Sequence, residues 1–233
     1  MADFIPKQLP LAVHLRPDAK LSSLYVEPNR WFVDWLQSEW PSSRIPFCWL
    51  DAEPGSGLSH VIQAIAQQGE QLGQSVFYVS FAQAHQLSSE VLADLAGFDL
   101  LCLDDLDCIA GQPEWDLALL HCFNEMQAQQ KQLVVGSHQA LATLKPQMLP
   151  DLWSRMSSGL VVHWRRPEYW ITAIEHVVQA QGMLMGAAAR QYFAARAPRD
   201  WAQVMMLVNT LDQAALSAQR RITIPFIRQV LDW

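Results

Sequence analysis

Short apolar runs alternate with stretches of helical periodicity over the first two thirds of this chain, and this alternation constrains the fold most. The apolar runs lie at 46–51, 75–81, 98–107, 132–138 and 159–164, and each is bounded by turn-forming residues. The stretches at 28–40, 58–72, 88–96 and 113–131 predict helices, with Ser88 as a cap and Pro113 in the first turn. Strands that alternate with helices form a parallel sheet covered on both faces. We therefore predict an α/β domain with a five-stranded parallel sheet.

The pattern changes after Arg166 from alternating elements to helices alone. Helices are predicted at 167–181, 186–196, 199–218 and 223–232, and Thr223 with Pro225 marks the start of the last one. The sequence thus predicts three parts. They are an extended, proline-interrupted tail at 1–20, an α/β domain at 21–166 and a small all-helical domain at 167–233.

Composition narrows the function classes. The net charge of −7 argues against a dedicated surface for duplex DNA, and no apolar run approaches the ~18 residues that span a bilayer. Cys48 and Cys102 lie inside apolar runs without a CxxC pair, which indicates core residues in a reducing compartment. We expect a cytoplasmic protein without a membrane partner, in which Trp31, Trp35 and Trp201 pack in the core.

A glycine-rich turn joins the first predicted strand to the following helix. This is the position of a phosphate-binding loop, where backbone N–H groups and a helix N-terminus bind anions. In the motif G-x-x-x-x-G-K-[ST], Gly57 and Ser59 match, but Ala52 and Leu58 replace the first glycine and the lysine. Leucine cannot supply the charge that lysine places on the phosphates. The turn alone fits an ordinary strand–helix connection equally well.

The third predicted strand ends in two acids, Asp104 and Asp105, after the apolar residues 100–103. This is the form of a Walker B strand, in which the first acid supports Mg²⁺ and the second position orients water. A strand that ends in a solvated acidic turn is the alternative. Both motifs in the expected order favour a nucleotide-binding module more than either does alone.

Five stretches together resemble the DnaA regulatory inactivators, the Hda proteins, which are DnaA-related AAA+ modules. The stretches are QLPLAV at 8–13, GSGLSH at 55–60, FDLLCLDDLDCIAG at 98–111, LPDLWSRM at 149–156 and LDQAALSAQRRITIPFIRQVL at 211–231. The resemblance implies an AAA+ P-loop fold with a helical lid. It also implies a negative regulator of replication initiation that binds the DNA-loaded sliding clamp, the β subunit of DNA polymerase III, and stimulates ATP hydrolysis by DnaA.

The resemblance assigns the nucleotide site to the loop and to two residues beyond it. These residues are Pro54, Gly55, Ser56, Gly57, Leu58, Ser59, His60, Asp104 and Arg199. Two charges that the family directs at phosphate are missing, because Leu58 and Ala202 stand in their places. We therefore expect at most weak binding of ADP and negligible ATP hydrolysis by this chain itself. The role of His138, in the sensor region after the fourth strand, stays open.

Arg155, in LPDLWSR, matches the family's arginine finger. An arginine acts in trans because its planar, permanently charged group stabilises charge that develops on a transferred phosphoryl group. The alternative is a surface ion pair with Asp151, four residues earlier.

The tail matches the family's clamp-binding pattern, a glutamine followed by spaced apolar residues. Its residues are Gln8, Leu9, Leu11 and Val13. An ordinary apolar tail is the alternative. If the match holds, DNA is reached only indirectly, through the clamp. Homo-oligomerisation stays open.

Three competing functions remain. A free-standing P-loop ATPase or kinase is opposed by Leu58 and Ala202. A DnaC-like helicase loader shares the superfamily, but LPDLWSR and QLPL favour the inactivator. An adaptor that binds clamp and DnaA without nucleotide also stays open.

Overall fold

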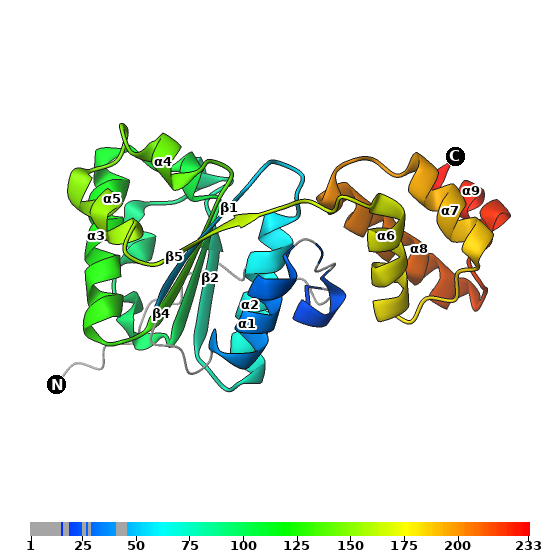
Figure 1. The fold of residues 1–233 in the computed structure, drawn as a ribbon, viewed down its shortest axis with the longest axis horizontal. Coiled ribbons are helices and arrows are strands. Elements are labelled where there is room, and N and C mark those ends of the chain that lie inside the picture. Colours follow the sequence, from blue (N-terminus) through cyan, green and yellow to red (C-terminus); the bar gives the residue numbers. More distant parts are fainter. Residues whose placement is uncertain (1–14, 16–18, 25–26, 28, 41–45) are drawn as a thin grey trace.

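The computed structural model describes residues 15, 19–24, 27, 29–40 and 46–233. Within them the strands form a single sheet in the order β2-β3-β4-β1-β5, and neighbouring strands of this sheet pair in parallel (Figure 1). The strands are β1 (Phe47–Ala52), β2 (Val76–Ser80), β3 (Leu100–Asp104), β4 (Gln132–Ser137) and β5 (Leu160–Trp164). The predicted five-stranded parallel sheet is confirmed.

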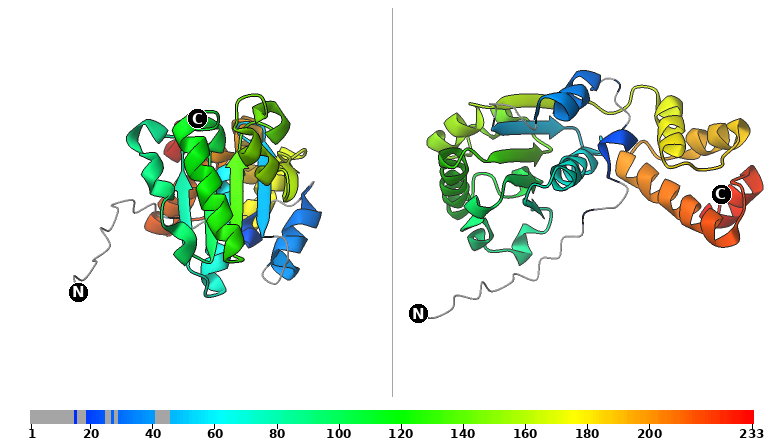
Figure 2. Two further views of the ribbon diagram at one scale, coloured as in Figure 1. Left: turned by 90° about the vertical axis from the view of Figure 1, so that its left-hand side faces the viewer. Right: turned by 90° about the horizontal axis from the view of Figure 1, so that it is seen from below.

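Helices cover both faces of this sheet, as Figures 1 and 2 show. On one face lie α1 (Arg30–Ser38) and α2 (Leu58–Gln71), and on the other α3 (Pro113–Ala128), α4 (Leu141–Leu144) and α5 (Pro150–Met156). Successive strand residues point to opposite faces. Trp49 of β1 therefore joins the cluster under α3, while Cys48 and Leu50 join the cluster under α2.

The predicted helix at 88–96 is wrong. Ser88 does act as a cap, since its side chain accepts a hydrogen bond from the N–H of Glu90. The chain then forms two 3₁₀ turns, Ser89–Leu92 and Leu95–Gly97. Ala93 is extended and Asp94 has φ of 57°, so the helical path is interrupted between them. A cap starts a turn but does not ensure that a helix continues.

The prediction that Trp31 packs in the core is also wrong. Its side chain is 56% exposed, and α1 buries Phe32, Val33 and Leu36 instead. Trp35 is half-buried and stacks on Phe32 at a ring-centroid distance of 5.9 Å. The buried face of this short helix is thus formed mainly by its aliphatic residues and Phe32, and Trp31 lies outside it.

The last part of the tail predicted at 1–20 packs against the α/β domain. Ala19 is fully buried, and Leu15 packs against the cluster on the α2 face. Leu21 and Leu24 continue this packing, so apolar side chains tie the last part of the predicted tail to the sheet domain. Gln8, Leu9, Leu11 and Val13 lie outside the described residues.

The chain after β5 forms a helical lid with its own apolar cluster. Its helices are α6 (Trp170–Ala180), α7 (Ala187–Arg196), α8 (Trp201–Ala218) and α9 (Ile224–Leu231). Asp200 caps α8 and Thr223 caps α9, as their side chains accept hydrogen bonds from the N–H groups of Gln203 and Phe226. The lid lies on the side of α1 and α2, opposite α3 and α5 (Figure 1). Within the described residues, no helix has the length and apolar character needed to cross a membrane.

Candidate functional site

The predicted phosphate loop lies between the carboxyl end of β1 and the first turn of α2. Gly55 and Gly57 have φ of 76° and 88°, in the left-handed region that glycine tolerates best. The N–H of Ser56 donates to the carbonyl of Glu53 at 3.2 Å, which closes the turn. The turn therefore needs its glycines for conformation. In the loop, Pro54 is exposed and Ser56 is buried. His60, in the first turn of α2, is buried as well.

Leu58 does not face the mouth of the loop. Its side chain is only 1% exposed and packs in the apolar cluster between α2 and the sheet. The position that carries lysine in the full motif therefore contributes packing energy here, and no charge. At this loop the phosphates of a nucleotide would meet backbone N–H groups and the start of α2, without a lysine charge.

The loop and the third strand meet as the two sequence motifs predict. Asp104 is fully buried, and its carboxylate accepts hydrogen bonds from the Tyr78 hydroxyl at 3.0 Å, the N–H of Asp105 at 3.0 Å and the Ser59 hydroxyl. Burial, with the charge of Asp105 adding to it, raises the pKa of Asp104 to about 6. Ser59 and Asp104 supply oxygen ligands of the kind that Mg²⁺ takes when it carries nucleotide phosphates. These two residues fit a nucleotide-bound Mg²⁺, whereas the side chain of Leu58 offers no charge to a phosphate.

His138, whose role the sequence left open, is held against the loop. Its N–H donates to Asp107 Oδ1 at 2.7 Å, and its ring Nδ1 lies 3.3 Å from the carbonyl oxygen of Ala52. Its Nε2 lies 3.6 Å from Asp105 Oδ1, while the other oxygen of Asp105 accepts a hydrogen bond from the Ser80 hydroxyl. The imidazole thus connects the start of the loop with the acidic turn after β3.

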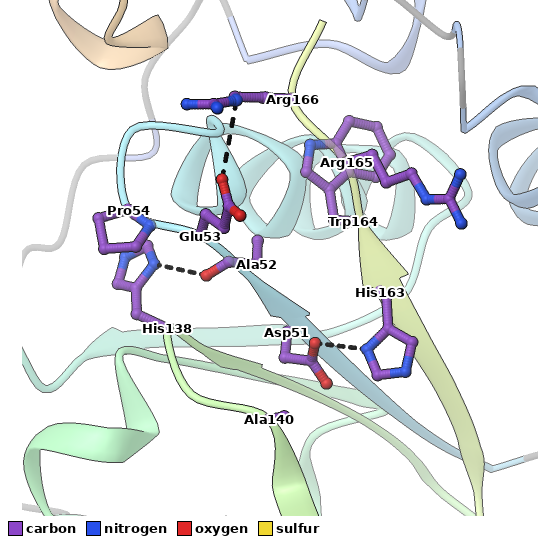
Figure 3. A pocket seen from close by; sticks show the side chains of 10 residues that line it. All are labelled: Asp51, Ala52, Glu53, Pro54, His138, Ala140, His163, Trp164, Arg165 and Arg166. Atoms are coloured by element: carbon purple, nitrogen blue, oxygen red, sulfur yellow. Dashed lines mark hydrogen bonds and ion pairs between the residues drawn. The ribbon is translucent and has the colours of Figure 1, made fainter. Parts of the chain in front are cut away.

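A cavity of about 500 Å³ opens at the carboxyl ends of β1 and β5, beside the loop (Figure 3). Figure 3 shows His163 and Asp51 turned toward each other, with Nδ1 and Oδ1 2.6 Å apart. Arg166 Nε lies 3.7 Å from Glu53 Oε2. The lining residues are Asp51, Ala52, Glu53, Pro54, His138, Ala140, His163, Trp164, Arg165 and Arg166.

Sequence reasoning missed the Asp51–His163 pair. The two residues are 112 positions apart and meet because β1 and β5 pair in parallel with these residues opposite each other. The strands themselves were predicted, but the pairing of β1 with β5 and its register were not. No local pattern marks either residue.

The start of α8 lies directly against the loop. The N–H of Trp201 donates to the carbonyl of Gly55 at 2.8 Å. Arg199, which the resemblance places in the nucleotide site, is exposed, and its guanidinium lies 5.4 Å from the centroid of the Trp170 ring. Asp200 and Trp201, which the sequence did not assign to the site, are the lid residues that contact the loop.

Arg155 is exposed on α5, and its guanidinium has one weak contact, 3.5 Å from Gln127 Oε1 of α3. Among the described residues it forms no ion pair with Asp151. Both views of the whole chain place α5 at the end of the molecule away from the lid (Figures 1 and 2). The sites that the resemblance assigns to nucleotide and to the finger are therefore separate within this chain.

Comparison with known proteins places the two parts of the chain in related families. The model of the bacterial DnaA ATPase domain matches residues 32–163, and the model of the Hda lid domain matches residues 168–231. A Haemophilus influenzae protein described as uncharacterized is 30% identical over 228 residues. The match covers 97% of this chain and 99% of the relative.

Solved structures agree on the fold. Domain III of the Thermotoga maritima replication initiation protein DnaA has a TM-score of 0.71 at 18% identity, covering 93% of this chain and 97% of that one. DnaA from Aquifex aeolicus bound to AMPPCP has a TM-score of 0.68 at 20% identity, covering 88% and 68%. At these identities the likeness concerns the fold alone.

Proposed function

The chain belongs to the family of the bacterial DnaA ATPase domain and carries a lid of the Hda type, and from this premise we propose that it regulates the initiation of DNA replication. In this proposal it stimulates ATP hydrolysis by a DnaA partner and converts ATP–DnaA to ADP–DnaA. It is then an activator of another protein's ATPase.

The observation that carries the proposal is the contrast between Arg155 and the chain's own loop. Arg155 is exposed, makes no ion pair with a described residue and lies on a helix at the end opposite the lid. An arginine in that position is available to a nucleotide held by another molecule. In the chain's own phosphate loop, by contrast, the position of the motif lysine is taken by Leu58, which is buried. A guanidinium that stabilises phosphoryl charge in trans is worth ~10³–10⁵ in rate.

The sliding clamp is the second proposed partner. Gln8, Leu9, Leu11 and Val13 would dock as an extended peptide, and the clamp on DNA would bring Arg155 to DnaA by raising its effective concentration. Contact with DNA is then indirect, through the clamp. The own site is proposed to bind ADP weakly, through the loop backbone and through Ser59 and Asp104 by way of Mg²⁺.

Arg155→Ala tests the trans role in a reconstituted assay with DnaA, clamp and DNA. We expect loss of nearly all stimulation, by up to ~10³–10⁵ in rate, with an unchanged melting temperature because the side chain is exposed. Arg155→Lys keeps the charge but loses the planar fork, so it should restore little. Arg220→Ala removes an exposed arginine of the lid and should leave stimulation intact.

The same assay without DnaA separates the proposal from the free-standing ATPase. We expect negligible phosphate release from this chain alone. Turnover that survives purification and does not depend on DnaA would support the ATPase instead. Arg155→Ala protein that stimulates as well as the parent would exclude the finger.

A further inference from the structure

The lid helix α8 contacts the phosphate loop through its first residue and its cap. Besides the hydrogen bond from the Trp201 N–H to Gly55, the indole packs on Gly57 so closely that a Cβ there would lie 2.5 Å from Trp201 Cδ1. A Cβ on Gly55 would lie 3.0 Å from Asp200 Oδ2. The two glycines thus serve a second purpose, which is to let the lid approach the loop.

Tryptophans from both domains pack at the interface between the loop and the lid. The rings of Trp201 and Trp170 are 5.7 Å apart, and Trp164 Nε1 donates to the carbonyl of Ser56 at 3.3 Å. Trp164 and Trp201 are 6% and 4% exposed. The cavity that remains between them, Ser56, Gly57 and Val61 has a volume of about 10 Å³.

This volume limits the size of a molecule that can lie between the loop and the lid. A cavity of about 10–15 Å³ holds one water molecule, and a nucleobase is many times larger. The 500 Å³ cavity is lined by the start of the loop and by the end of β5, and not by Trp201. A base can therefore enter between loop and lid only when the indole of Trp201 leaves.

We propose that Trp201 is an internal plug that holds the lid closed on the loop, so that nucleotide binding and lid closure exclude each other. The indole packs directly against Gly57, and the Trp201 N–H donates a hydrogen bond to the Gly55 carbonyl, which ties the start of α8 to the loop. ADP then binds only to the open form. The proposal deepens the proposed weak nucleotide site and is independent of DnaA and the clamp.

If Trp201 acts as a plug, its substitution should raise the affinity of the protein for ADP. If the open form is 1–10% populated, the apparent Kd for ADP is raised roughly 10- to 100-fold by the closed form. Trp201→Ala should therefore bind ADP at least about tenfold tighter than the parent in calorimetry with Mg²⁺. Trp201→Leu keeps an apolar side chain in the lid cluster and should show the same gain if the alanine variant folds poorly. Trp31→Leu changes an exposed tryptophan that is not at the loop, and should leave the affinity unchanged.

Hydrogen exchange on the parent protein provides a second measurement. The Trp201 amide is protected by its bond to Gly55, so millimolar ADP should speed its exchange as the lid opens. If folded Trp201→Leu binds ADP no tighter than the parent, or if ADP leaves the amide equally protected in a saturated complex, the plug is excluded. Because these experiments use this protein alone, tighter ADP binding without any stimulation of DnaA would contradict only the proposed function.

Discussion

At the scale of single residues, the buried acid of β3 differs most from its ordinary chemistry. Asp104 is fully buried beside Asp105, and three hydrogen-bond donors compensate only part of the cost of its charge. Its pKa of about 6 lies above the usual value of an aspartate, so folding favours the protonated form, although most of these carboxyl groups are still ionised at neutral pH. Folding and site chemistry therefore make opposite demands on this carboxyl group, because a bound cation requires it to be ionised.

This gives a pH-dependent prediction for Asp104→Asn. The parent binds a proton at Asp104 more tightly when folded than when unfolded. The stability linked to that proton is present below pH ~4 and is lost as pH rises through about 6. In metal-free buffer the variant should therefore gain stability relative to the parent over this range, by at most about 3 kcal/mol. Urea unfolding at pH 4.5 to 7.5 measures it.

Asp99→Asn provides a control of opposite sign. Lys131 and Ser75 hold the pKa of Asp99 below its usual range, so the ionised form is favoured in the folded protein. Its substitution should cost stability at neutral pH and lose this effect as the pH falls toward the pKa of Asp99. A difference between parent and Asp104→Asn that does not change with pH would show that Asp104 titrates normally.

At the scale of elements, the first turn of α2 packs in the hydrophobic core. In a P-loop enzyme the same position carries a lysine that binds phosphate. Leu58 packs with Val61 and Ile62 under the sheet. The turn keeps the shape of a phosphate loop because Gly55 and Gly57 allow it, while its lysine position has become part of the hydrophobic cluster. Restoring the motif by sequence alone therefore conflicts with the packing of the helix.

Leu58→Lys should not create an ATPase. Burying an ammonium group in this cluster should lower the free energy of unfolding by several kcal/mol, and ATP turnover should stay absent. Leu72→Lys, on the cap that ends the same helix, changes a 50% exposed side chain and should cost less than about 0.5 kcal/mol. Thermal and urea unfolding compare the two variants. A Leu58→Lys protein as stable as the parent that binds ADP tightly would mean that position 58 reaches the mouth of the loop.

At the scale of the whole molecule, the α/β domain separates Arg155 from the contact between the loop and the lid. α5 with Arg155 lies at one end, and the lid closes on the loop at the other (Figure 1). The residues proposed to bind the clamp precede, in the sequence, Leu15 and Ala19, which pack against the α/β domain. In the proposed function, the packing of Leu15 and Ala19 would keep the α/β domain close to a tail that is docked on the clamp.

The double variant Gln8→Ala with Leu9→Ala tests the tail. We expect clamp binding and the clamp-dependent part of DnaA stimulation to be lost. The melting temperature should hardly change, because the sequence predicts an extended tail, and such a tail buries little surface. Leu15→Ala is the matched control, since Leu15 packs on the α2-face cluster. It should lower the melting temperature and keep clamp binding. Unfolding of the double variant would indicate a structural role for the tail. Normal clamp binding by the folded double variant would place the contact elsewhere.

The sequence by itself determined the α/β class, the five parallel strands and the all-helical lid, because side-chain periodicity is a local property. It also determined that the loop lacks its lysine, which is a matter of identity at one position. Only the tertiary structure decided where Leu58 points, that Asp51 meets His163 across paired strands, and that Trp201 closes on Gly55 and Gly57. The last two features join residues between about 110 and 150 positions apart, and contacts over such separations depend on strand order and domain packing, which no local pattern encodes.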